Sequence, residues 1–163
     1  MCWQCDHPGA TASDYCEHLV EEIARYGWIV QGVERDRIHP PWAYTVGLTE
    51  ADLPELVVTG LPSWRAAALL NGVAEHTVHA EPPVPGTQVQ LVDGPLIEVV
   101  RIPVPDAHLM VAVGLYGPDI RALQLVHADD RGHWPWDSYF RGIRGGQPVL
   151  GPREPEARRT RIG

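Results

Sequence analysis

Two neighbouring stretches, WAYTVGL at residues 42–48 and ELVVTGL at residues 55–61, decide the fold. Both are rich in the β-branched and aromatic residues that are typical of strands. Two strands this close in sequence are expected to pair as a hairpin. Side chains alternate between the two faces of a strand, so Trp42, Tyr44 and Val46 should share one face.

A helix is expected on each side of this hairpin. Ser13 is the expected N-cap of a helix from Asp14 to about Tyr26, and Gly27 follows at the position where a left-handed residue ends a helix. A second helix is expected from Ser63 to about His76.

The remaining chain contains more strand patterns than helix patterns. Strands are expected at residues 28–34, 89–92, 96–104 and 121–127. Residues 109–115 fit a strand or a helix, and 135–140 fit a helical turn. Adjacent strand pairs favour an α+β fold with a mainly antiparallel sheet and two principal helices. The sequence leaves open whether the sheet curls into a partial barrel.

The apolar content predicts one domain over residues 1–151, with residues 1–12 as a cysteine-containing arm. Residues 152–163 carry almost no apolar side chains, so we expect a disordered tail there.

The composition bears on the partners. The net charge is −8 and all 13 basic residues are arginine, which argues against a nucleic-acid partner. No apolar run approaches the roughly 20 residues that cross a bilayer. The beginning of the chain does not resemble a signal peptide, and three cysteines do not suggest a disulfide framework, so we expect a cytoplasmic protein.

The cysteines and a nearby histidine suggest a metal site. Cys2, Cys5 and His7, with Cys16 further along, are thiols and an imidazole at short spacing, which can close a tetrahedron around zinc. Reduced thiols in a docked arm and a redox pair are the alternatives, and the sequence leaves all three open.

The most polar cluster follows the strand at 121–127. His133 lies four residues after Asp129, and an imidazole beside a carboxylate can act as a general acid and base. His39 is a further candidate for proton transfer. The alternative is a structural role, in which the same residues form a polar turn that closes one end of the core.

Aromatic residues suggest a pocket for a ligand. Trp42 and Tyr44 from the first strand, with Gln124 and the indoles of Trp134 and Trp136, could line one hollow, although a core strand explains the first two equally well.

The glycine-rich segment 141–147 could place Arg141 or Arg144 at the rim of this hollow to hold a phosphate or a carboxylate. A flexible connector is the alternative there.

Three blocks of the sequence, in order, resemble one family. They are residues 41–61, residues 122–136 and the segment QPVLG at 147–151, and together they resemble the domain of unknown function 4262 family. The resemblance implies a small, soluble bacterial domain over about residues 13–151, with no established activity. It also favours Asp129, Gln124 and Trp136 as a shared site over a metal site with His127 and His133 as ligands.

Two functions are therefore expected. The first is a module that binds a small molecule or a protein partner in an aromatic-lined pocket. The second is a small enzyme that uses His39, Asp129 or His133 for acid–base chemistry in that pocket. A domain stabilised by zinc through the cysteine cluster is a further alternative.

Overall fold

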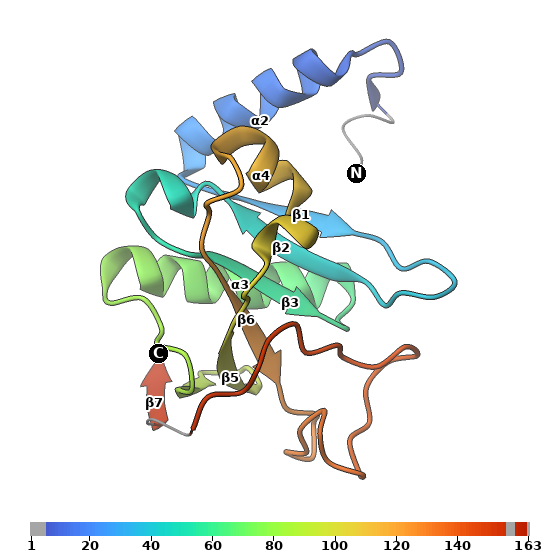
Figure 1. The fold of residues 1–163 in the computed structure, drawn as a ribbon, viewed down its shortest axis with the longest axis vertical. Helices are drawn as coiled ribbons and strands as arrows, with labels where there is room; N and C mark the ends of the chain where they lie inside the picture. The colour runs from blue at the N-terminus through green and yellow to red at the C-terminus, as the bar shows by residue number, and fades with distance from the viewer. Residues whose placement is uncertain (1–5, 156–158, 163) are drawn as a thin grey trace.

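The computed structural model describes residues 6–155 and 159–162, which form one mixed β-sheet with helices on both faces (Figure 1). The strands lie in the order β1-β2-β3-β6-β5-β4-β7. Most neighbours are antiparallel, but β3 runs parallel to β6 and β4 runs parallel to β7. The strand bounds are β1 Ile29–Val33, β2 Trp42–Val46, β3 Glu55–Thr59, β4 Gln88–Leu91, β5 Leu96–Arg101, β6 Ala122–His127 and β7 Arg159–Ile162.

The hairpin expected from residues 42–61 is confirmed, with β2 and β3 antiparallel and Tyr44 opposite Val57. The same row continues into β6, where Val57 is in register with Gln124. A short 3-10 helix, η1 (Leu48–Ala51), connects the two strands of the hairpin.

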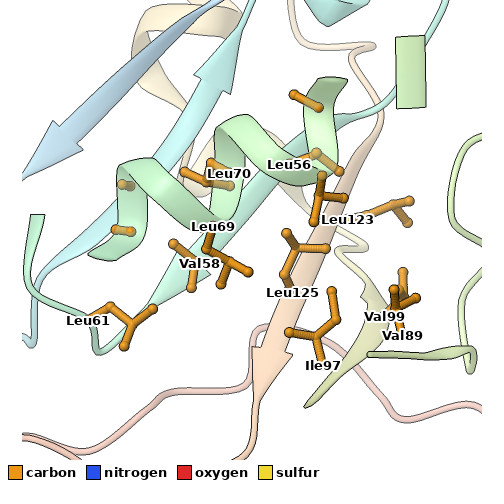
Figure 2. Packing of buried hydrophobic residues seen from close by; sticks show 14 of the residues in the cluster. Leu56, Val58, Leu61, Leu69, Leu70, Val89, Ile97, Val99, Leu123 and Leu125 are labelled. Carbon is orange, nitrogen blue, oxygen red and sulfur yellow. The ribbon is translucent and has the colours of Figure 1, made fainter. Parts of the chain in front are cut away.

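Helix α3 (Ser63–His79) covers one face of the sheet. Leu70 and Val73 of α3 are fully buried and belong to one apolar cluster with Leu56 of β3 and Leu125 of β6 (Figure 2). Burying a side chain of this size contributes about 1.5–3 kcal/mol. This cluster is the larger part of the core, and it fixes α3 beside the parallel pair β3–β6.

The opposite face of the sheet is covered by α2 (Ala12–Tyr26) and α4 (Met110–Tyr116). Ile23 of α2 and Ala112 of α4 join Tyr44 and Val46 in a second apolar cluster. The C-terminal segment, residues 147–155, crosses the same face over β6, as Figure 1 shows in red.

The helix boundaries lie within three residues of the expected ones, and the first cap differs. Thr11, rather than Ser13, caps α2, because its hydroxyl accepts the N–H of Asp14 while the Asp14 carboxylate accepts the N–H of Thr11. Gly27 ends α2 with φ +87°, as predicted. Helix α3 continues to His79, three residues beyond its expected end.

The fold is α+β and mostly antiparallel, as expected, but one detail of the expected fold class is wrong. Residues 6–155 and 159–162 contain three α-helices instead of two, because the ambiguous residues 109–115 contribute α4. The sheet, which the sequence left as either open or a partial barrel, is open, because β1 and β7 lie at opposite edges. Residues 135–140 form turns instead of a helical turn, with Asp137 and Phe140 donating to carbonyls three residues earlier.

The strand at one edge of the sheet lies within residues 152–163, which the sequence predicts to be a disordered tail. Arg159–Ile162 form β7 and pair with Gln88–Leu91 of β4. Disorder over residues 152–163 stays a prediction. Over the part of the chain that the structure describes, no helix is both long enough and apolar enough to cross a membrane.

Candidate functional site

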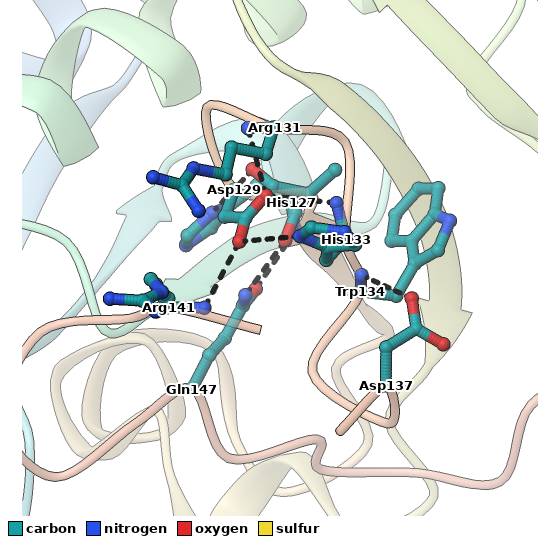
Figure 3. Close-up of polar contacts among 9 residues, drawn as sticks. His127, Asp129, Arg131, His133, Trp134, Asp137, Arg141 and Gln147 are labelled. Carbon is teal, nitrogen blue, oxygen red and sulfur yellow. Dashed lines mark hydrogen bonds and ion pairs between the residues drawn. The ribbon is translucent and has the colours of Figure 1, made fainter. Parts of the chain in front are cut away.

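The candidate site is the loop that follows β6, and it is built around the side chain of Asp129 (Figure 3). One oxygen, Oδ1, accepts the backbone N–H groups of Arg131 at 2.9 Å and His133 at 2.8 Å. The other, Oδ2, accepts the backbone N–H of Arg141 at 3.0 Å and lies 3.3 Å from Nδ1 of His133. One carboxylate therefore joins the two ends of a 13-residue loop.

These contacts change the acidity of Asp129. Burial alone would raise the pKa of its carboxyl group, but the N–H groups of His133, Arg141 and Arg131 stabilise the carboxylate more strongly. Together with the imidazole they lower the pKa of Asp129 to about 2. The carboxylate is therefore ionised at neutral pH, and its oxygens are already hydrogen-bonded.

His133 is the one candidate catalytic residue that reaches Asp129. Its ring is half-buried, with Nδ1 on the carboxylate, and the centres of the His133 and Tyr139 rings lie 6.0 Å apart. His39, in contrast, is exposed in the β1–β2 connection and pairs with Asp36, with 2.9 Å between Nδ1 and Oδ2. The structure thus brings together two of the three residues expected to transfer protons.

His127, at the end of β6, has a structural environment. Its ring nitrogens lie 3.3 Å from the backbone oxygens of Ala128 and Thr59, and burial lowers the pKa of its imidazole. The side chain of Gln147 accepts the N–H of His127 and donates to its carbonyl, both at 2.8 Å. Gln147 thereby extends the hydrogen bonding of the strand into the C-terminal segment.

The predicted aromatic pocket is occupied by the chain itself. Trp42 donates its indole N–H to the carbonyl of His108, and the hydroxyl of Tyr44 accepts the N–H of Val111 at the start of α4. Gln124 donates to Thr59 and to the carbonyl of Pro148, and it accepts the N–H of Leu150.

The other two indoles form a separate stack. The rings of Trp134 and Trp136 lie 5.3 Å apart and nearly parallel. The guanidinium of Arg153 covers Trp136 at 3.6 Å and also forms a bidentate ion pair with the buried carboxylate of Glu98. This stack fastens the loop and the C-terminal segment to β5.

Two pockets flank the loop, and neither is lined by Trp42, Tyr44, Gln124, Trp134 or Trp136. The larger, about 1190 Å³, is an open groove between the outer side of α3, the β4–β5 hairpin and residues 128–130 and 132. Trp64 of α3, a residue that is 73% exposed, forms part of its wall.

The smaller pocket, about 580 Å³, lies within the loop. Arg141 lines it, together with His133 and four neighbours. Arg144 is exposed and lines neither pocket.

Glu55 is a buried polar residue that sequence reasoning missed. Its carboxylate accepts the hydroxyls of Thr45 and Thr49 and the N–H groups of Gly47 and Thr49, all within 3.1 Å. Burial raises the pKa of Glu55 despite these donors. A single acidic residue at the start of an apolar strand was the available signal. The carboxylate folds the η1 connection onto the end of the hairpin.

The expected metal ligands lie mostly outside the region that can be described. Cys2 and Cys5 fall outside residues 6–155 and 159–162, whereas Cys16 is a free, exposed thiol on α2 and His7 is exposed. Within the described ranges, no group of three or more histidine, cysteine or acidic side chains is arranged to hold a metal ion. The zinc site stays a prediction.

Comparison with known proteins identifies a family but no characterised relative. The model of a domain of unknown function, DUF4262, matches residues 22–141. No curated protein and no solved structure matches the chain.

Proposed function

The chain belongs to the DUF4262 family, whose description assigns no function, and from the geometry we propose that it is a binding module for an extended peptide segment of a protein partner. The segment would lie in the groove between α3 and the β4–β5 hairpin. The observation that carries the proposal is this continuous open groove with the exposed indole of Trp64 in its wall.

The length of the groove favours a peptide over a compact small molecule. Its lining runs along α3 from Trp64 to His79, which corresponds to about 22 Å at 1.5 Å per residue. An extended peptide advances about 3.3 Å per residue, so about seven residues would fill this length. A compact ligand would contact only part of the lining.

The lining has the composition of a binding surface. Leu61, Leu69, Leu91 and Leu96 supply apolar contacts along the groove. Large exposed aromatic residues at such positions carry much of the energy of partner binding, which makes Trp64 the expected anchor contact. Polar groups surround the apolar strip, including an ion pair of 3.6 Å between Arg65 and Asp130.

A selection from random heptapeptides displayed on phage tests the proposal. Peptides enriched on the full chain should share an apolar or aromatic position, because that side chain would contact Trp64. We expect the substitution Trp64→Ala to weaken their binding at least about tenfold, as hot-spot truncations do.

Tyr26→Ala is the matched control, because Tyr26 is also an exposed aromatic residue on a helix but does not line the groove. It should leave peptide binding unchanged. Enriched peptides that bind the Trp64→Ala variant as tightly as the original chain would contradict the proposal, as would a selection without enrichment.

A second candidate function is supported by the contact between His133 and Asp129. A carboxylate that orients an imidazole is an arrangement of acid–base enzymes, and this pair lies beside the smaller pocket. Hydrolysis of a panel of ester and phosphoester substrates, lost in His133→Gln and retained in His39→Gln, would favour an enzyme.

A cytoplasmic location remains part of both proposals and is supported by the odd number of cysteines.

A further inference from the structure

The smaller pocket has a chemistry that the proposed peptide binding does not use. It lies within the loop that follows β6 and is lined by Arg131, His133, Ser138, Tyr139, Phe140 and Arg141. Five of these six side chains carry N–H or O–H groups that can donate hydrogen bonds. No acidic residue lines the pocket, although the chain as a whole has a net charge of −8.

The two guanidinium groups of this pocket are available for a ligand. Among the described residues, neither the Arg131 nor the Arg141 side chain forms an ion pair or a hydrogen bond; only their backbone N–H groups do. In Figure 3 both side chains extend to the same side of the loop. A pair of unpaired guanidiniums beside one pocket favours an anionic ligand.

The acidic residues of the loop are engaged elsewhere. Asp129 is surrounded by backbone N–H groups and by His133, as described above. Asp137 accepts the N–H of Trp134, and Asp130 pairs with Arg65 on the side of the larger groove. These contacts leave the positive charge of the pocket without a neutralising carboxylate in its lining.

Asp129 also holds the pocket in shape. Its two oxygens bind the backbone N–H groups of Arg131 and Arg141, so one buried side chain fixes the backbone from which both guanidiniums project. A site that is ordered before its ligand arrives avoids part of the entropic cost of binding.

We propose that this pocket is an oxyanion site that binds a phosphate group, either as free phosphate or as the phosphate of a monoester. A phosphate dianion has two charges and three acceptor oxygens, which suits two arginine forks with additional donors from His133, Ser138 and Tyr139. A carboxylate would use fewer of these donors. The site shares no lining residue with the peptide groove, so it goes beyond the proposed function and can be tested separately.

The test is a titration of the full chain, uniformly labelled with ¹⁵N, at pH 7.5, where a phosphate monoester is mostly dianionic because its second pKa is about 6. Inorganic phosphate and phenyl phosphate are the two phosphate probes, and acetate is the carboxylate probe. We expect saturable shifts of the side-chain Nε–Hε signals of Arg131 and Arg141 with either phosphate probe. Tighter binding of phenyl phosphate would identify a monoester as the ligand, and equal binding would identify free phosphate.

Three substitutions that each remove one positive charge show where the anion binds. Arg131→Gln and Arg141→Gln should each weaken phosphate binding at least about tenfold, because each removes charge-assisted hydrogen bonds. Arg144→Gln should change it less than about twofold, because Arg144 is exposed in the same segment but does not line the pocket. Both pocket variants retain the backbone N–H that binds Asp129, so the fold should persist.

Four results would overturn the proposal. The first is an equal loss of binding in Arg144→Gln, which would indicate only the overall charge of the chain. The second is acetate binding as tight as phosphate binding, which would indicate a carboxylate site. The third is the lack of a saturable response to either phosphate probe in the original chain, a measurement that does not depend on any variant. The fourth is a saturable response confined to signals outside residues 129–141, which would place the anion elsewhere.

Discussion

The carboxylate of Asp129 binds both the side chain and the backbone of His133, with 3.3 Å from Oδ2 to Nδ1 and 2.8 Å from Oδ1 to the amide nitrogen. The same carboxylate accepts the backbone N–H of Arg141, twelve residues further along the chain. Asp129 is therefore the residue that organises this loop, and residues of the loop line both pockets.

The substitution Asp129→Asn tests this role. An amide has one acceptor oxygen in place of two, so some of the N–H groups of Arg131, His133 and Arg141 lose their partner. We expect these three amides to exchange with solvent at least about tenfold faster in the variant, because the loop opens more readily. Hydrogen exchange followed by NMR measures this directly, and unchanged exchange rates would show that the loop is held by other contacts.

Acid should loosen the same loop. The pKa of Asp129 falls from 3.8 to about 2 on folding, so its carboxylate contributes stability above pH 4 that is lost as the pH falls toward 2. The protection factors of the three amides, which are exchange rates corrected for the intrinsic pH dependence of exchange, should fall over this interval in the original chain. In Asp129→Asn this fall should disappear, because the variant has no carboxyl group to protonate there.

The buried carboxylate of Glu55 predicts the opposite dependence on pH. Burial raises its pKa above 4.5, so its contribution to stability is largest at low pH and is lost as the pH rises through the raised value. Glu55→Gln should fold and lose this dependence. Glu55→Ala leaves buried donors of Thr45, Gly47 and Thr49 without an acceptor and should cost at least about 3 kcal/mol.

Urea denaturation of both Glu55 variants between pH 4 and pH 8 measures these free energies of unfolding. If the Gln and Ala variants were equally stable, the hydrogen bonds of Glu55 would not hold the η1 connection.

Gly60 is a position where only glycine fits. Its φ is +72°, and a Cβ atom there would lie 2.5 Å from the carbonyl oxygen of Gly146. Gly60→Ala should therefore lower the free energy of unfolding by at least about 1–2 kcal/mol, from the left-handed backbone alone.

Gly72→Ala is a suitable control, since Gly72 lies in α3 and a Cβ atom there would meet no other atom within 4 Å. Alanine favours a helix by about 1 kcal/mol over glycine, so this variant should be as stable as the original chain or more so. Thermal denaturation of both variants measures the difference. If Gly60→Ala and Gly72→Ala shifted the melting temperature in the same direction, glycine would not be required at position 60.

The thiols at the start of the chain call for a metal measurement on protein purified without a histidine tag. A structural zinc site at Cys2, Cys5, His7 and Cys16 predicts about one equivalent of bound zinc, because such sites retain their metal. Reduced thiols predict less than about a tenth of an equivalent. The serine variant of Cys5 separates specific from surface-bound zinc, since only specific zinc would be lost with it.

Much of the fold follows from patterns along the chain. The period of the apolar residues predicted α2 and α3, the hairpin followed from two close strands, and Gly27 marked the end of α2. The seven residues of α4 were ambiguous because they are apolar throughout and too short for a period to show. The open sheet was not predictable either, since the pairing of β3 with β6 joins residues far apart in sequence.

The candidate site, too, was predicted only in part from the sequence. The contact of His133 with Asp129 was visible in the spacing of four residues. Tyr44 and Gln124, which were expected to line one hollow, lie in one row across the sheet, through Val57. The hollow expected between them is filled by α4 and by the C-terminal segment, whose backbone groups bind their side chains. Strand periodicity indicates which face a side chain occupies but not which segment covers that face.

The crystal structure of the full chain with the tightest selected heptapeptide tests the central proposal most directly. We predict an extended peptide along α3, with an apolar side chain against Trp64 and its other end near His79. A peptide bound at an edge of the sheet, or on the face covered by α2 and α4, would contradict it.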